Sequence, residues 1–307
     1  MGQFIGRRLI GSLPILFGIT ALVFLILHLI PGDPAQIMLF GTNATPEQVV
    51  HLRQALGLDR PLLVQYGDFV WRLLHGDLGV SFLSQRRVAE EIAIQFPATA
   101  TLALVTMVIA AGIGLGAGVL GAVYRDGWVD MLGTGFSVLG VAVPNFWLSV
   151  LLILVFAVHL GWLPALGEGG VRGIILPAAS LGWGFSAIIT RLCRASLIEV
   201  LAQPYVSTAY AKGLRARVVV LRHALKNALI PVVTLLGLQL GNLLSGAVVV
   251  ETIFGRQGIG SLAVRAIQAK DFPTIQGVVL VVALVYVLVN LLVDVMYAAL
   301  DPRVHYG

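Results

Sequence analysis

Long apolar runs separated by shorter polar segments dominate the 307-residue chain. A helix that spans a bilayer needs about 20 mostly apolar residues. Six runs meet this length, at residues 9–30, 98–123, 132–160, 174–190, 228–250 and 274–300. The pattern therefore predicts an all-α integral membrane protein with about six transmembrane helices, forming a single transmembrane domain over residues 1–307.

Two of the runs contain features that modify this picture. The third run is long and contains Pro144, where we expect a kink because proline disrupts the helical hydrogen-bond ladder. The first run follows Arg7 and Arg8 and resembles a signal peptide, but it is longer than a usual signal and no small-residue cleavage site follows it. We expect it to be an uncleaved span.

Between the first two runs, residues 31–97 form a polar segment with its own helical pattern. In TPEQVVHLRQALGL, Thr45 and Pro46 have the residue types of a helix N-cap and first turn. PLLVQYGDFVWRLLHGDLG predicts a second, amphipathic helix that ends near Gly76. We expect a helical extracytoplasmic insertion, lying partly in the membrane interface through residues 69–71.

Composition and charge agree with a membrane protein. Hydrophobic residues make up 58% and charged residues only 11%, whereas a soluble domain has about 25% charged residues. The net charge of +5 gathers in the segments on the side of the two termini. The positive-inside rule then predicts that both termini are cytoplasmic, and no nucleic-acid partner is needed to explain the charge.

The sequence contains no motif of a catalytic or metal site. Walker A, His-Glu-x-x-His and Gly-x-Ser-x-Gly patterns are all absent, and the single Cys193 excludes a cysteine-based metal site within one chain. We therefore expect a chain that is not an enzyme and binds no cofactor or metal. Gln239, Asn242 and Asn290 could line a polar path or bridge helices by hydrogen bonds. The candidate residues of a translocation path are Gln239, Asn242 and Glu251. For Asp294 we expect an interhelical or capping pair.

Residues 204–231 form a dense basic segment that lacks carboxylates. Pro204 can open a short helix and Gly213 can end it in the left-handed conformation. A second helix should run from about residue 216 into the fifth apolar run, with an apolar stripe at Val218, Leu221 and Leu225. A helix lying on the lipid surface is one interpretation. A docking element for a cytoplasmic partner is the other, and it accounts better for the helix–glycine–helix form.

This segment, PYVSTAYAKGLRARVVVLRHALKNALIP, resembles the Glu-Ala-Ala loop of permeases in ATP-binding-cassette importers. Residues 207–209 replace Glu-Ala-Ala with Ser-Thr-Ala, and the proline comes late, at Pro231. With these two differences, the loop resembles that of one subclass, the dipeptide, oligopeptide and nickel permeases. Further matches in chain order are RRLIGSLPILFGITALVFLILHLIPGDPA, GDLGVS at 76–81, FPATATLAL at 96–104, VPNFW at 143–147, GWLPALG at 161–167, GAVVVETIFGRQGIG at 246–260 and LDPRV at 300–304.

The resemblance implies a permease subunit that imports dipeptides or oligopeptides across the cytoplasmic (inner) membrane of a prokaryote. The partners it implies are a second, homologous permease subunit in a heterodimer, two cytoplasmic ATPases that carry ATP and Mg²⁺, an extracytoplasmic substrate-binding protein and membrane lipid. Residues 191–227 would be a cytoplasmic coupling loop that contacts the ATPase. Its implied site residues are Tyr205, Ser207, Thr208, Ala209, Lys212, Gly213, Arg215, His223 and Asn227.

Three alternatives to peptide import remain at this point. One is a membrane-scaffold subunit with no substrate path, which the absence of a polar central cavity would favour. A permease of the same family can import nickel or another small solute. A secondary transporter is more distant, because it would carry inverted repeats and ionisable groups at the bilayer midplane, which this sequence does not show.

Overall fold

The computed structural model describes residues 2–29, 35–36, 45–55, 57–167 and 170–300. Its helices are α1 (Gly2–Leu29), α3 (Pro46–Ala55), α4 (Leu62–Leu74), α5 (Val88–Val123), α6 (Trp128–Ala142), α7 (Asn145–Leu152), the π-helical segment η1 (Ile153–His159), α8 (Val171–Leu201), α9 (Pro204–Ala211), α10 (Ala216–Val218), the π-helical segment η2 (Val219–Ala224), α11 (Leu225–Gly246), α12 (Val248–Ile253), α13 (Ile259–Gln268) and α14 (Phe272–Leu300). The described residues form no β-strand, and the predicted all-α class is confirmed.

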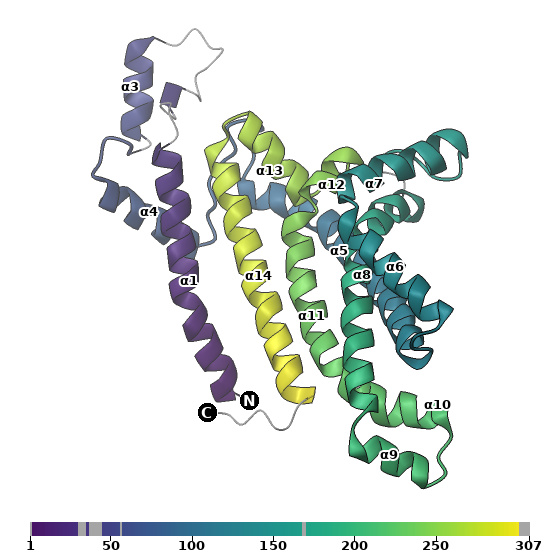
Figure 1. The fold of residues 1–307 in the computed structure, drawn as a ribbon. Helices are drawn as coiled ribbons and strands as arrows, with labels where there is room; N and C mark the ends of the chain where they lie inside the picture. Colours follow the sequence, from purple (N-terminus) through teal and green to yellow (C-terminus); the bar gives the residue numbers. More distant parts are fainter. Residues whose placement is uncertain (1, 30–34, 37–44, 56, 168–169, 301–307) are drawn as a thin grey trace.

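Helices α1, α14, α11 and α8 stand side by side in Figure 1. Helices α3, α4, α12 and α13 lie toward one end of this array, and α9 and α10 lie at the other. Five helices among the described residues are long and apolar enough to cross a membrane, or up to six if the bent pair α6 and α7–η1 is one span. The predicted number of spans is therefore confirmed.

Close contact between α5 and α8 forms the centre of the molecule. Gly114 and Gly118 are buried on the face of α5 that meets α8. A Cβ atom at Gly114 would lie 2.6 Å from Ile189 Cβ, and one at Gly118 would lie 2.7 Å from Cys193 Cβ. The two backbones approach this closely because both glycines lack a side chain.

The third predicted span is broken rather than gently kinked. Pro144 separates α6 from α7, and the two halves meet at an angle of 103°. Ser137 and Ser149, on either side of the break, are buried and donate their hydroxyls to carbonyls one turn earlier in their own helices. This bonding satisfies polar side chains in an apolar environment. The proline kink is confirmed, and it is sharper than a kink in one continuous span.

Helices α11, α14 and α1 form a second packed group. Gly237 and Gly241 of α11 lie against Val293 and Tyr286 of α14, where added Cβ atoms would collide. Helix α1 packs on α14, and Arg8 Nε lies 3.3 Å from Asp294 Oδ2. The expected interhelical pair of Asp294 is confirmed, with Arg8 as the partner.

The insertion between the first two spans contains the predicted helices. Thr45 and Gln48 exchange hydrogen bonds of 2.9 and 3.4 Å at the start of α3, which is a capping box. Helix α4 ends before Gly76, whose φ of +73° suits a glycine. Helix α5 then begins at Val88, inside the segment expected to be outside the membrane, and continues through Pro97.

The glycine packing between α5 and α8 gives a direct test. Gly114→Ala should lower the melting temperature of the purified protein, since overpacking of this kind costs about 1–3 kcal/mol. Gly116→Ala is the matched control, because it lies one half-turn away on the same helix and its Cβ would meet nothing within 4 Å. Equal melting temperatures for the two variants would contradict the packing described for α5 and α8.

Candidate functional site

The basic segment folds as a helical hairpin at the end of α8. Helix α9 starts at Pro204, directly after a turn at the end of α8. Two backbone hydrogen bonds cap its C-terminal end. Gly213 N donates to Tyr210 O at 2.9 Å, and Leu214 N donates to Ala209 O at 3.4 Å. Gly213 has a φ of +79°, a conformation that favours glycine and ends helices. The predicted helix–glycine–helix form is confirmed.

One face of α9 is fixed to the body of the protein. Val206 and Val219 are fully buried, and with Ala209 they form a small apolar cluster against Leu201 at the end of α8. This cluster makes α9 part of the α8–η2 unit rather than a free arm, because burying these side chains favours one orientation.

A polar link joins α9 to the start of α11. Asn227 Nδ2 donates a hydrogen bond of 2.8 Å to the Tyr205 hydroxyl, which lies 3.5 Å from the carbonyl oxygen of His223. Three of the predicted loop residues therefore meet at one point. Through this link and the apolar cluster, α9 contacts both the α8 and the α11 helices.

The predicted apolar stripe at Val218, Leu221 and Leu225 is not the face that packs on the body of the protein. Val218 and Leu221 are 38% and 48% exposed. The buried residues are instead Val219, Val220, Ala224 and Ala228, which pack against the ends of α5 and α8. Part of this stretch, Val219–Ala224, is the π-helical segment η2, whose turn is wider than that of an α-helix.

The outer face of the hairpin is polar and basic. Five of the predicted site residues are exposed there, namely Ser207, Thr208, Lys212, Gly213 and Arg215. Ala209 is different because it is only 8% exposed and belongs to the apolar cluster. A large substitution at Ala209 would therefore disturb the hairpin itself, whereas Ser207 and Thr208 are free to contact a partner.

An ion pair near the same end of the molecule was not expected from the sequence. Arg194 of α8 donates to both carboxylate oxygens of Asp130 on α6, at 2.5 and 2.7 Å. The Asp126 amide also donates to Asp130, at 3.0 Å. Charge-assisted bidentate bonding of this kind is strong and directional. It holds the α5–α6 turn against α8.

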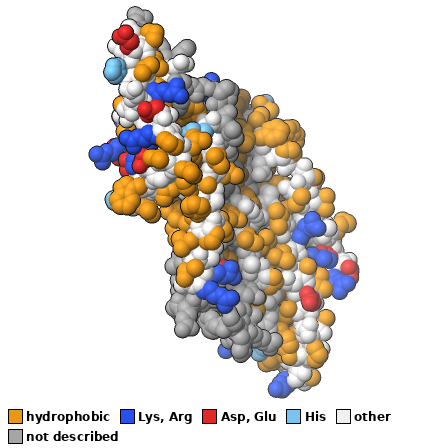
Figure 2. Space-filling model, turned by 90° about the vertical axis from the view of Figure 1, so that its left-hand side faces the viewer, with side chains coloured by type: hydrophobic (Ala, Val, Ile, Leu, Met, Phe, Trp, Pro, Cys, Tyr) orange, Lys and Arg blue, Asp and Glu red, His pale blue; other side chains and the backbone are white. Residues whose placement is uncertain are grey.

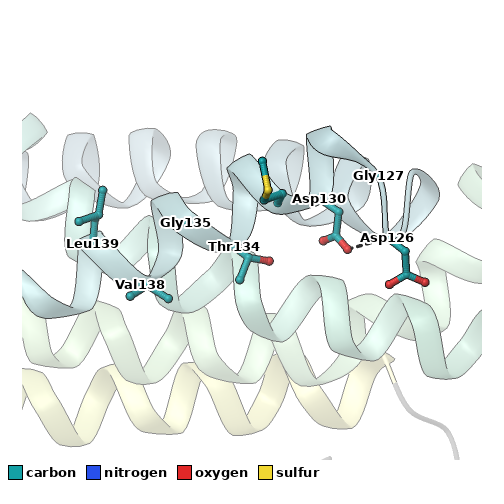
Figure 3. A pocket seen from close by; sticks show the side chains of 8 residues that line it. Asp126, Gly127, Asp130, Thr134, Gly135, Val138 and Leu139 are labelled. Carbon is teal, nitrogen blue, oxygen red and sulfur yellow. Dashed lines mark hydrogen bonds between the residues drawn. The ribbon is translucent and has the colours of Figure 1, made fainter.

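Beside this ion pair, α6 borders a shallow pocket of about 570 Å³. Figure 3 shows its lining, with Asp126 and Asp130 at one end and Val138 and Leu139 at the other. The Asp130 carboxylate is already paired with Arg194. Among the described residues, no group of three or more His, Cys, Asp and Glu side chains is placed to hold a metal.

At the opposite end, Glu251 is fully buried just beyond α11. It accepts hydrogen bonds from the Thr99 hydroxyl at 2.5 Å and from the Ser261 amide at 3.2 Å. The Gly260 amide also donates to it. These amides belong to the first turn of α13, where the helix dipole favours a negative charge. Burial raises the pKa of Glu251, and the hydrogen bonds from Thr99 and the α13 amides partly oppose this rise.

This arrangement explains why the GAVVVETIFGRQGIG motif contains glycines at 258 and 260 and an arginine at 256. A Cβ atom at Gly258 would collide with the Glu251 carboxylate, and one at Gly260 would lie 2.6 Å from the Val248 Cα atom. Arg256 donates to the carbonyl oxygens of Gly167 and Ala98 at 2.7 and 3.3 Å. Burial lowers the pKa of Arg256, while the nearby Glu251 charge acts in the opposite direction.

Asp271, at the start of α14, is a second buried carboxylate that accepts several hydrogen bonds. Its carboxylate accepts hydrogen bonds from the Ser81 hydroxyl at 2.5 Å, the Phe82 amide at 3.0 Å and the Thr274 hydroxyl at 2.8 Å. We call the Glu251 and Asp271 carboxylates with these partners the outer carboxylate clamps, where outer denotes the α13 end of the molecule. They hold the two ends of the α13 segment against α5 and against residues 81–82.

The three candidate path residues do not form one cluster. Asn242 Nδ2 donates to Gln239 Oε1 at 3.2 Å on α11, and Gln239 is buried while Asn242 is exposed. Glu251 lies roughly three turns further along, within the outer carboxylate clamp. A role of Gln239, Asn242 and Glu251 in translocation stays a prediction.

Comparison with known proteins identifies the class. Residues 112–306 match the family described as binding-protein-dependent transport system inner membrane component, and residues 1–103 match the N-terminal region of such membrane components. The chain belongs to this family, as an inner-membrane permease subunit of an ATP-binding-cassette importer of the dipeptide, oligopeptide and nickel type. The resemblance inferred from the sequence motifs is confirmed.

Within this family, the chain is similar to glutathione transport system permeases. It is 44% identical over 306 residues to the permease GsiC of Escherichia coli (strain K12), with 100% of both chains covered. It is 45% identical over 300 residues to GsiC of Pectobacterium atrosepticum, with 98% of both covered.

Solved structures share the fold. The inward-facing MetNI methionine ABC transporter matches with a TM-score of 0.58 and 20% identity, covering 68% of this chain and 96% of that chain. An amino acid ABC transporter crystallised with histidines matches with a TM-score of 0.52 and 16% identity, covering 70% and 94%. At this identity the likeness concerns the fold alone.

The raised pKa of Glu251 predicts a specific pH dependence of stability. The folded protein keeps a proton on this carboxyl at pH values where the unfolded chain has lost it. The resulting stabilisation is complete below the usual value of 4.5 and is lost as the pH rises through the raised pKa. The melting temperature of the wild type should therefore fall relative to that of Glu251→Gln over this range. A difference that is independent of pH, or that grows in the opposite direction, would contradict this assignment.

Proposed function

We propose that this chain imports peptides, and that α9 is the helix through which partner ATPases drive it. The observation that carries this proposal is the placement of α9. Its inner face is fixed by Val206 and Ala209, while Ser207, Thr208 and Lys212 are exposed at the end of the molecule. A short helix with a rigid base and a polar outer face is suited to entering a cleft of another protein.

The orientation in the membrane follows from charge. The start of α1, the end of α14 and the α9–α10 hairpin lie at the same end of the molecule (Figure 1). Arg215, Arg217 and Lys226 are exposed near that end, and cations are enriched on the cytoplasmic side of membrane proteins. Both termini and α9 are therefore cytoplasmic in this proposal, and α13 is extracytoplasmic.

Coupling would act through the two connections of α9. ATP and Mg²⁺ belong to the partner ATPases, and this chain contributes no catalytic group. When the ATPases close, they displace α9, and its contacts with α8 and with Asn227 of α11 carry this movement into the spans. For import to result, the transported molecule must bind the two conformations with different affinities.

The outer surface would receive the substrate. The segment around α13 is held by the outer carboxylate clamps, and it offers a rigid surface for an extracytoplasmic binding protein. A second permease subunit would complete the pathway.

A peptide substrate is supported by the names of the similar permeases, because glutathione is a tripeptide. Uptake of labelled glutathione and dipeptides, compared with uptake of Ni²⁺ by the same reconstituted complex, distinguishes the substrate classes.

Thr208→Asp tests the docking role of α9. Thr208 is exposed, and its hydroxyl donates to the Pro204 carbonyl at 3.0 Å. A carboxylate here should greatly reduce co-purification of the ATPases and abolish uptake, without changing the amount of inserted permease. It places an unpaired charge in a desolvated interface.

Thr252→Asp is the matched control. Thr252 is an exposed threonine with the same type of hydrogen bond, to Val248 at 2.8 Å, and it lies at the opposite end of the molecule. It should retain the ATPases. Equal ATPase retention by the two variants would refute α9 as the docking element.

A further inference from the structure

Helix α4 is fixed to α1 by an aromatic contact. Phe69 is buried, with its ring centroid 5.9 Å from that of Phe24 on α1. The ring of Tyr66 lies 5.4 Å from Phe24, and its hydroxyl is 2.9 Å from the Thr20 hydroxyl. The expected interface contact of residues 69–71 is thus wrong for Phe69, because this side chain packs on α1.

The depth of this contact along α1 decides where α4 lies. Tyr66 also packs on Phe17, with ring centroids 5.7 Å apart. Phe17, Thr20 and Phe24 all belong to the membrane-spanning part of α1, Gly6–Leu25. At a rise of 1.5 Å per residue, Phe17 lies about 12 Å along the helix from Leu25. Helix α4 therefore sits beside the apolar part of the span rather than beyond its end.

The face of α4 that points away from α1 is apolar. Leu63, Trp71 and Leu74 are 85%, 66% and 76% exposed, and their spacing places them on one side of the helix. Asp68 and Arg72, one turn apart, form a separate narrow charged strip. The Asp68 carboxylate is paired with Arg60 at 3.2 Å, so this charge is partly compensated.

The first span exposes apolar side chains as well. Ile10, Leu13 and Leu22 of α1 are all more than half exposed, as expected for a helix in contact with lipid. Figure 2 views the side of the molecule on which α1 and α4 lie, and hydrophobic side chains cover much of it below the charged groups of the insertion.

We propose that α4 is embedded in the interface of the bilayer leaflet at the α13 end, with Leu63, Trp71 and Leu74 in contact with lipid acyl chains. The helix lies in the membrane without crossing it, in the manner of a monotopic amphipathic helix. Its charged strip reaches the headgroups, and its contact with α1 ties the insertion to the first span. The occupant of this face is lipid rather than a protein partner.

Probe accessibility tests this placement in the assembled transporter. A Leu74→Cys variant carries an environment-sensitive fluorophore, and the complex is reconstituted into lipid nanodiscs. The native Cys193 is fully buried, so labelling is directed to the new cysteine, and the unlabelled parent is the blank. We expect strong quenching by lipids with a nitroxide high on the acyl chain and weak quenching by aqueous iodide. His51→Cys on exposed, polar α3 is the control and should show the reverse preference.

Two outcomes would overturn the proposal. Iodide quenching at position 74 as strong as at position 51 would mean that α4 lies in water. Protection from both quenchers, or protection that appears only when the substrate-binding protein is added, would mean that a protein covers this face.

Tryptophan fluorescence tests the same contact without a new cysteine, so the result does not depend on whether Leu74→Cys folds correctly. Brominated lipids should quench tryptophan fluorescence in the native protein, and the quenched fraction should fall in Trp71→Phe. An unchanged quenched fraction would equally refute lipid contact at Trp71.

Discussion

Helix α8 ends at the α9–α10 hairpin, and its position depends on how closely α5 can approach it. Gly114 and Gly118 allow that approach, because any side chain there would overlap Ile189 or Cys193. In a bilayer there is little hydrophobic driving force between helices, so packing of small residues carries much of the association. The same helix ends directly before α9, so the α5–α8 packing is connected to the hairpin that we propose as the coupling site.

Polar contacts complete this frame at both ends of the spans. Arg194 and Asp130 fix the α5–α6 turn to α8 near the hairpin. At the other end, Glu251 and Asp271 hold the start of α13 and of α14. Each buried carboxylate has several hydrogen-bond donors, and a buried charge is tolerated in proteins only when it is compensated in this way. In the proposed coupling, these fixed ends would let a displacement of α9 move whole helices rather than be absorbed by local bending.

The sequence predicted features with a local signal. Long apolar runs predicted the spans, Thr45 and Pro46 predicted the start of α3, and the positive φ of Gly213 agrees with its predicted role. The failures have physical causes. Periodicity did not identify Val219, Val220 and Ala224 as the buried residues of η2. Phe69 and Trp71 lie on different sides of α4 although they are close in sequence. The Asp130–Arg194 pair joins residues far apart in the chain, and no local pattern marks it.

If α9 contacts an ATPase in the assembled transporter, a photoreactive group on its exposed face should cross-link to that subunit. Ser207→Cys, exposed on α9, would carry a photoreactive group in the assembled transporter, with Thr252→Cys at the opposite end as the reference. We expect a cross-link from position 207 to an ATPase subunit, with a yield that changes when ATP is bound, and none from position 252. A cross-link from position 207 only to lipid, or only to the extracytoplasmic binding protein, would refute the assignment of α9 as the docking helix.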